Sequence, residues 1–134
     1  MDILSPNERS ALMSRIRGKN TKPELVVRRI LHALGYRFRL HRRDLPGTPD
    51  IVLPKYRKAI QVHGCFFHSH QGCQFAYKPK TRTAFWRAKF AENMERDQRT
   101  DRALRAAGWK PIIVWECETR RPAKLTKRLE RLLP

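Results

Sequence analysis

The chain has 134 residues and a mass of 15.9 kDa, which fits one domain, and we treat residues 1–134 as that domain. Its 30 Lys and Arg against 12 Asp and Glu give a formal charge of +18, which favours nucleic acid over an anionic membrane as the partner and argues against an enzyme of neutral metabolites. The sequence lacks an apolar run of roughly 18 residues for a membrane helix and an apolar secretory leader, and its three cysteines, an odd count, favour a reducing cytoplasm.

Two helices are predicted near the N-terminus. Ser5, Pro6 and Glu8 form a capping box with Pro at the first helical position, so a helix is expected over residues 6–17. Residues 21–24 repeat this signature. Apolar residues then recur at helical spacing until Gly35, namely Val27, Ile30, Leu31 and Leu34.

Three strands are predicted next. Apolar and arginine side chains alternate over residues 36–40, as they do in a half-exposed strand. After a loop over residues 41–49, the runs at 50–53 and 57–63 are expected to pair as a hairpin through the turn at 54–56.

The second half of the chain is predicted to hold two helices and one strand. Residues 64–80 show no regular pattern, and a long helix over residues 83–107 is expected to end at Gly108. An apolar strand over 109–115 and a helix over 122–133 complete the order ααβββαβα. This order indicates an α/β fold in which helices flank a mixed β-sheet.

Asp50 stands directly before one predicted strand, and Gln61, Val62 and His63 end the next. Neighbouring strands would bring these groups to one end of the sheet, where carboxylate and carbonyl oxygens can bind Mg²⁺. Phosphodiester hydrolysis uses such a cation to neutralise the attacked phosphate and to activate water. The spacing resembles the PD-(D/E)xK nuclease motif, although Pro-Asp before a strand is also a common turn device.

Cysteine and histidine residues cluster in the irregular segment. Cys65, His70 and Cys73 have the spacing C-x4-H-x2-C, and Cys117 follows the predicted strand 109–115. Four such ligands suit tetrahedral Zn²⁺ in a closed, structural site. His68 can replace His70 as the ligand, and the alternative to zinc is a set of buried or free thiols.

Aromatic residues form the third pattern. Phe66 and Phe67 lie in the irregular segment, and Trp86 begins the long helix between Arg82 and Arg87. Apolar wedges inserted between base steps kink DNA at a weakened pair. Packing in the core is the alternative for each of these aromatics.

Four separated segments resemble the very-short-patch repair endonucleases: LPGTPD at 45–50, HGCFFH at 63–68, KTRTAFW at 80–86 and VWEC at 114–117. The resemblance extends from about Ser10 to the last helix. It implies a restriction-endonuclease-like fold with a loop held by structural zinc. It also implies Mg²⁺-dependent nicking of one DNA strand 5′ to the thymine of a T:G mismatch, which arises when 5-methylcytosine deaminates.

The resemblance also implies roles for individual residues. Asp50 would be the metal-binding carboxylate, the Val62 backbone carbonyl a second metal ligand, and Glu24 the holder of metal-bound water. His68 would act as general base or position the water, with His63 beside it. Asn93 and Asp97, on one face of the long helix, would support the catalytic groups from behind. Phe66, Phe67 and Trp86 would insert into the DNA as wedges beside the mismatch.

Two departures from the family pattern bear on this assignment. The loop after Phe67 is one residue longer, so His70 as zinc ligand is a choice of alignment, and Val62 replaces a hydroxyl residue. The expected partner is duplex DNA with a T:G mismatch, bound by a monomer, with mismatch-repair proteins as possible further partners. The alternatives are a restriction-type nuclease that cuts matched duplex and a non-catalytic, zinc-stabilised DNA-binding module.

Overall fold

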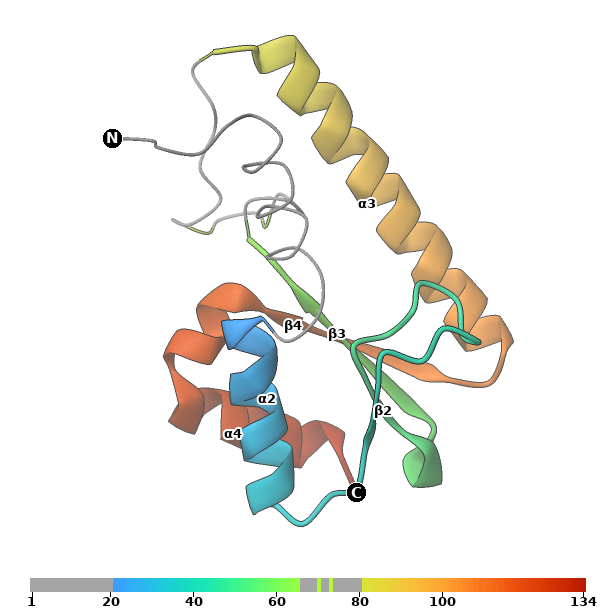
Figure 1. Ribbon diagram of the computed structural model, residues 1–134, viewed down its shortest axis with the longest axis vertical. Coiled ribbons are helices and arrows are strands. Elements are labelled where there is room, and N and C mark those ends of the chain that lie inside the picture. Colours follow the sequence, from blue (N-terminus) through green and yellow to red (C-terminus); the bar gives the residue numbers. More distant parts are fainter. Residues whose placement is uncertain (1–20, 66–69, 71–72, 74–80) are drawn as a thin grey trace, which may run out of the picture.

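The computed structural model describes residues 21–65, 70, 73 and 81–134. In this part of the chain a four-stranded sheet separates two short helices from one long helix (Figure 1). The helix predicted over residues 6–17 lies outside the described residues. The remainder confirms an α/β fold with a mixed sheet.

The sheet has the order β1-β2-β3-β4. Its strands are β1 (Arg39–Leu40), β2 (Ile51–Leu53), β3 (Lys58–His63) and β4 (Lys110–Trp115). The β1–β2 and β2–β3 pairs are antiparallel, which confirms the predicted hairpin, with Ile51 opposite Ile60. Strands β3 and β4 are parallel, because the chain crosses over through the long helix before it returns.

Helices α2 (Lys22–Ala33) and α4 (Pro122–Leu132) lie side by side on one face of the sheet (Figure 1). The Thr21 side chain caps α2 by accepting a hydrogen bond from the Glu24 amide at 3.4 Å, as the sequence predicts. The two helices and the sheet enclose the larger core, whose fully buried members include Val27, Leu31, Ile51, Leu53, Ile60, Val114, Leu125 and Leu129.

Helix α3 (Thr83–Ala106) runs along the other face of the sheet (Figure 1). Near its C-terminus Leu104 packs with Val52, Ala59 and Trp109 in a smaller core. Gly108, at φ +87°, ends the helix as predicted, since a left-handed residue there lets the Trp109 amide bond back to the Leu104 carbonyl at 2.9 Å. Upstream of Leu104, most side chains of α3 are exposed.

Two segments differ from the sequence-based prediction. The strand expected over residues 36–40 shrinks to Arg39–Leu40, because β2, its partner in the sheet, is itself only Ile51–Leu53. Short 3₁₀ helices, η1 (Pro54–Tyr56) and η2 (Glu116–Arg120), occupy the hairpin turn and the connection before α4. In the described part of the chain, the structure contains no helix with the length and apolar character needed to cross a bilayer.

Candidate active site and metal centre

Asp50 lies directly before β2, where the hairpin brings it beside the end of β3. Its Oδ2 accepts a hydrogen bond from the Val62 amide at 2.8 Å. In a β-strand the N–H and C=O of one residue point to the same side, so the Val62 carbonyl also lies on the side of Asp50. The structure thus brings together the carboxylate and the backbone group that the sequence pairs.

Glu24 reaches the same place from the first turn of α2. Its side chain is 1% exposed, and its Oε1 lies 2.5 Å from Nη2 of Arg28 and 2.6 Å from Nε2 of His41. One donor atom from each of Glu24, His41 and Asp50 lies within 4.8 Å of the other two. Two carboxylates so close together repel each other unless a cation or hydrogen-bond donors offset their charges. The donor set therefore fits a divalent cation.

The loop over residues 41–49 is anchored on both sides. Arg42, in the loop, has its guanidinium carbon 5.3 Å from the centroid of the Trp109 ring, which attaches the loop to that ring. Arg57, after the hairpin turn, lies over the same ring at 5.0 Å. Gly47, at φ +71°, lies against α3 so closely that an added Cβ would be 2.3 Å from Cγ2 of Thr100. A larger residue at this position would push the loop off α3, and Asp50 with it.

His63 faces α3 rather than α2. Its ring is 4% exposed, with Nδ1 3.9 Å from Oδ2 of Asp97 and the ring edge against Trp115, at a centroid distance of 5.4 Å. His63, Asp97, Gln61 and Thr100 line a hollow between the sheet and the helix. A carboxylate beside a buried imidazole favours one orientation of the ring. Asp97 thus stands where the sequence places a supporting residue.

The other predicted residues of α3 share the sheet-facing side of the helix. Asn93 lies one turn before Asp97 and accepts a hydrogen bond from Arg96 at 2.8 Å. Trp86 lies two turns further towards the N-terminus, half-buried, with its ring 5.3 Å from Phe85 and 5.9 Å from Phe90. These rings form an aromatic group at the start of α3.

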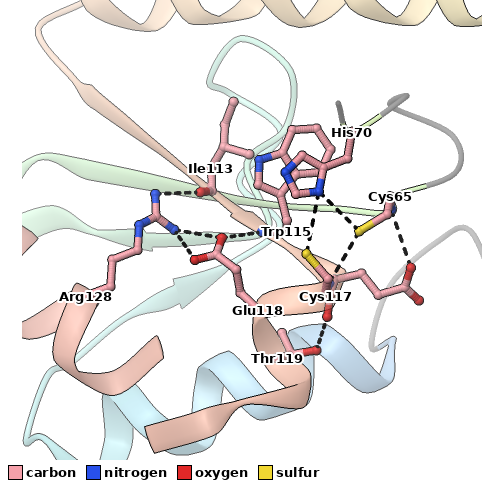
Figure 2. A network of polar contacts seen from close by, with 9 residues as sticks. Cys65, His70, Ile113, Trp115, Cys117, Glu118, Thr119 and Arg128 are labelled. Atoms are coloured by element: carbon pink, nitrogen blue, oxygen red, sulfur yellow. Dashed lines mark hydrogen bonds and ion pairs between the residues drawn. The ribbon is translucent and has the colours of Figure 1, made fainter. Parts of the chain in front are cut away.

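The cysteine and histidine side chains meet where β4 ends and η2 begins. One donor atom from each of Cys65, His70, Cys73 and Cys117 lies within 4.8 Å of the others, so the four side chains could hold a metal ion. Nδ1 of His70 is 3.7 Å from Sγ of Cys65 and 3.5 Å from Sγ of Cys117 (Figure 2). Two ligands of a tetrahedral Zn²⁺ with Zn–S near 2.3 Å and Zn–N near 2.0 Å are about 3.6 Å apart.

The surroundings hold this cluster in place. The His70 ring stacks on Trp115 at a centroid distance of 4.0 Å (Figure 2). Glu118 accepts a hydrogen bond from the Trp115 amide at 2.9 Å. Arg128 of α4 donates hydrogen bonds to both carboxylate oxygens of Glu118, each at 2.9 Å. Burial raises the pKa of Cys65 to about 12 and also raises that of Cys117. Without a metal these thiols are therefore protonated at neutral pH, and a bound metal has to displace their protons.

The family model described as DNA mismatch endonuclease Vsr matches residues 1–74. The type II nicking enzyme V.XorIIP of Xanthomonas oryzae pv. oryzae is 52% identical over 132 residues, which cover 98% of this chain and 96% of the relative. The DNA mismatch endonuclease Vsr of Escherichia coli is 41% identical over 125 residues, 93% of this chain and 80% of the relative. The chain belongs to the Vsr family.

A third relative supports the same assignment. The type II nicking enzyme V.NmeAIP of Neisseria meningitidis serogroup A is 42% identical over 132 residues, 98% of this chain and 94% of its own. The protein is therefore a DNA endonuclease of restriction-endonuclease-like type, as the four sequence segments indicate.

Three site residues expected in this Vsr-family endonuclease, His68, Phe66 and Phe67, lie outside the described residues. One neighbour of Asp50 and Glu24, His41, escaped the sequence analysis. It lies in a basic loop with no motif around it, and its approach to Glu24 depends on β1 pairing with β2. For the contact of Glu24 with Arg28, the spacing of four residues on a helix was a local signal.

Proposed function

We propose that this endonuclease nicks one DNA strand 5′ to the thymine of a T:G mismatch in a Mg²⁺-dependent reaction. The observation that carries the proposal is the Asp50 carboxylate, held against the Val62 amide, with Glu24 within 4.8 Å, in a chain of charge +18. In a protein that has to approach phosphates, a buried glutamate and a half-buried aspartate this close together have a use as cation ligands. The name of the Escherichia coli relative, a DNA mismatch endonuclease, supports the substrate class.

In this proposal each residue has a task that follows from its position. Asp50 and the Val62 carbonyl hold the cation, and Glu24, with a carboxylate oxygen within 4.8 Å of Asp50, binds it directly rather than through water as the resemblance implies. When bound, the cation neutralises the attacked phosphate and activates water. His68 accepts the proton of the attacking water, and His63 assists it. Asp97 and Trp115 both lie against the His63 ring, so its orientation is set before DNA arrives.

The cluster of Cys65, His70, Cys73 and Cys117 is proposed to hold one structural Zn²⁺. All four positions are filled by protein side chains, so no position remains for water or substrate. This zinc would join residues 65–73 to the start of η2, and the loop that carries His68, Phe66 and Phe67 lies inside that span. The metal would thereby set where these three residues stand.

Recognition of the mismatch requires more than charge. Phosphate contacts are independent of sequence and do not distinguish a T:G pair from a matched one. A wobble pair costs less to unstack, so we propose that Phe66, Phe67 and Trp86 insert beside it. Trp86 and Phe90 lie on the same side of α3 as Asp97, which supports the insertion of Trp86 from the side of the helix that faces the proposed site.

The experiment that tests the proposal compares paired duplexes. The protein with Mg²⁺ is incubated with T:G and C:G duplexes of randomised flanks, and nicked strands are sequenced. Nicks confined to T:G duplexes, on the thymine strand and 5′ to the thymine, are expected. Cleavage of matched duplex at a fixed sequence would instead identify a restriction-type enzyme, and binding without cleavage would identify a DNA-binding module.

Replacing Trp86 by Ala should weaken binding to T:G duplex by about ten- to a hundredfold, with a much smaller effect on matched duplex. A base-stacked aromatic is worth about 1–3 kcal/mol by alanine substitution. Met94→Ala is the control, because it removes an exposed apolar side chain, 38% accessible, from the same helix. Gel-shift titration of both duplexes measures the ratio, and equal losses on the two duplexes would contradict insertion of Trp86.

Replacing His68 by Ala should lower the nicking rate by about 10²–10⁴-fold, the usual contribution of a general base. The wild-type rate should also fall below about pH 6.5, where an unperturbed imidazole is protonated. His32→Ala, at an exposed position in the last turn of α2, is the matched control. Single-turnover rates across pH decide the matter, and a His68 variant within tenfold of wild type would exclude this role.

A further inference from the structure

His41 lies in an unusual position for a loop residue. Its side chain is 13% exposed, and its Nε2 is 2.6 Å from Oε1 of the buried Glu24. Its backbone is left-handed, at φ +48°, a conformation that costs a non-glycine residue of order 1–3 kcal/mol. The His41 amide donates a hydrogen bond to the Asp50 carbonyl at 3.0 Å, which fixes His41 next to the residue directly before β2. The fold thus holds this imidazole beside both carboxylates.

The spacing of the three side chains suits one cation. Ligands at about 2.1 Å from an octahedral metal are about 3.0 Å apart when adjacent and about 4.2 Å apart when opposite. The donor atoms of Glu24, His41 and Asp50 all lie within 4.8 Å of one another, and those of Glu24 and His41 are 2.6 Å apart. Movements of a few tenths of an ångström therefore separate the present arrangement from a shared metal.

We propose that His41 is a third side-chain ligand of the catalytic cation, which it binds through Nε2 together with Asp50 and Glu24. The inference rests on the proposed function only in taking this group as the cation centre. In the metal-bound state the proton on Nε2 is lost from that nitrogen, and the ring proton resides on Nδ1. A nitrogen donor among oxygens favours Mn²⁺ over Mg²⁺, since imidazole ranks among the better ligands for transition metals and Mg²⁺ prefers oxygen.

Arg28 sets the charge of this centre. Its guanidinium contacts Oε1 of Glu24 at 2.5 Å, so with a neutral His41 the four side chains sum to a charge of −1. A divalent cation brings that sum to +1, and a DNA phosphate returns it to zero. The centre should therefore bind its cation more tightly once DNA is present, which couples metal binding to substrate binding.

The test uses the zinc-loaded full chain with Mn²⁺ and no DNA. Electron spin echo modulation of bound Mn²⁺ detects a directly coordinated imidazole ¹⁴N. We expect this modulation in the wild type, its loss in His41→Gln, and its retention in His32→Gln, the same change at an exposed histidine. Titration should show that His41→Gln weakens Mn²⁺ binding by about tenfold or more and Mg²⁺ binding by less.

Each outcome decides the inference. Absence of ¹⁴N modulation in the wild type, or its persistence in His41→Gln, would overturn it, because another histidine or none would then be the ligand. Unfolding of the variant is checked by its zinc content and melting temperature, and His41→Asn, a shorter side chain with an amide, serves if the glutamine variant fails. The assay involves no nicking, so a protein that binds Mn²⁺ through His41 but spares T:G duplexes would refute only the proposed function.

Discussion

The Asp50→Asn variant is expected to lose nicking activity by about 10³-fold or more while it binds T:G duplex as tightly as the wild type, or more tightly. The side-chain oxygen of the new asparagine can still accept the hydrogen bond that the Val62 amide now donates to Oδ2 of Asp50 at 2.8 Å. The end of the strand therefore keeps its structure. The substitution removes the charge that binds the cation, and metal ions contribute several kcal/mol to such reactions, at 1.36 kcal/mol for each factor of ten. Single-turnover cleavage and gel-shift affinity, measured on one preparation, test both parts.

Asp44→Asn is the matched control for this variant. Asp44 lies in the loop that leads to Asp50, its side chain is 63% exposed, and its hydrogen bonds with Arg42 hold its pKa below the usual value. Both substitutions therefore remove one ionised carboxylate and raise the formal charge of +18 by one. A gain in DNA affinity common to both variants is due to net charge, and a loss of nicking is expected only for Asp50. Substantial nicking by Asp50→Asn would refute its assignment as the metal carboxylate.

Loss of the metal from the cysteine cluster is expected to lower the melting temperature by about 10 °C or more. Cys65 is completely buried, and its thiolate would join Cys73, Cys117 and His70 around one ion. Binding of structural zinc is worth about 10 kcal/mol or more in small domains, and much of it is folding free energy. Cys65→Ser should therefore lose zinc and unfold at lower temperature, with a similar shift after chelation of the wild type.

Thr119→Val separates loss of metal from local damage. Thr119 is buried in η2 and donates to the Glu116 carbonyl at 2.6 Å, so its replacement costs about 1 kcal/mol next to the cluster but leaves the four ligands intact. This variant should keep one zinc per chain. Protons compete with the metal for the thiolates, so zinc should be released as the pH falls. Near-stoichiometric zinc in Cys65→Ser, or a wild type that is equally stable without metal, would show that the thiols are merely buried.

Local patterns were sufficient to predict most helices and strands. The caps and apolar spacing around Thr21, Val27 and Leu31 predict α2 within about a residue, because a helix is stabilised by groups three and four positions apart. The apolar alternation of residues 36–40 overestimates β1, since strand length depends on the partner strand, which no local pattern reveals.

The candidate site divides in the same way. Asp50 and Val62 were predictable, because a recurring chemical motif relates them across a short hairpin, 12 positions apart. The cysteine spacing was predictable, because Cys65, His70 and Cys73 fall within nine residues. The contact of His63 with Asp97 was foreseen only as a general supporting role for α3. His41 was not predictable, because a left-handed residue in a loop of arginines has no local signature.

The sequence alone therefore determined the type of chemistry, namely a basic DNA endonuclease with a carboxylate at a strand end and a four-ligand cluster. Residue type and short spacing indicated the ligands, and the four segments that resemble the very-short-patch repair endonucleases indicated the activity. Only the tertiary structure showed how the distant groups reach one another and that His41 joins Glu24. Pairing of β1 with β2 brings His41 to Glu24, and crossover through α3 brings Cys117 to Cys65. These contacts join residues 17 and 52 positions apart, and the packing of helices on the sheet, rather than any neighbour in sequence, sets their geometry.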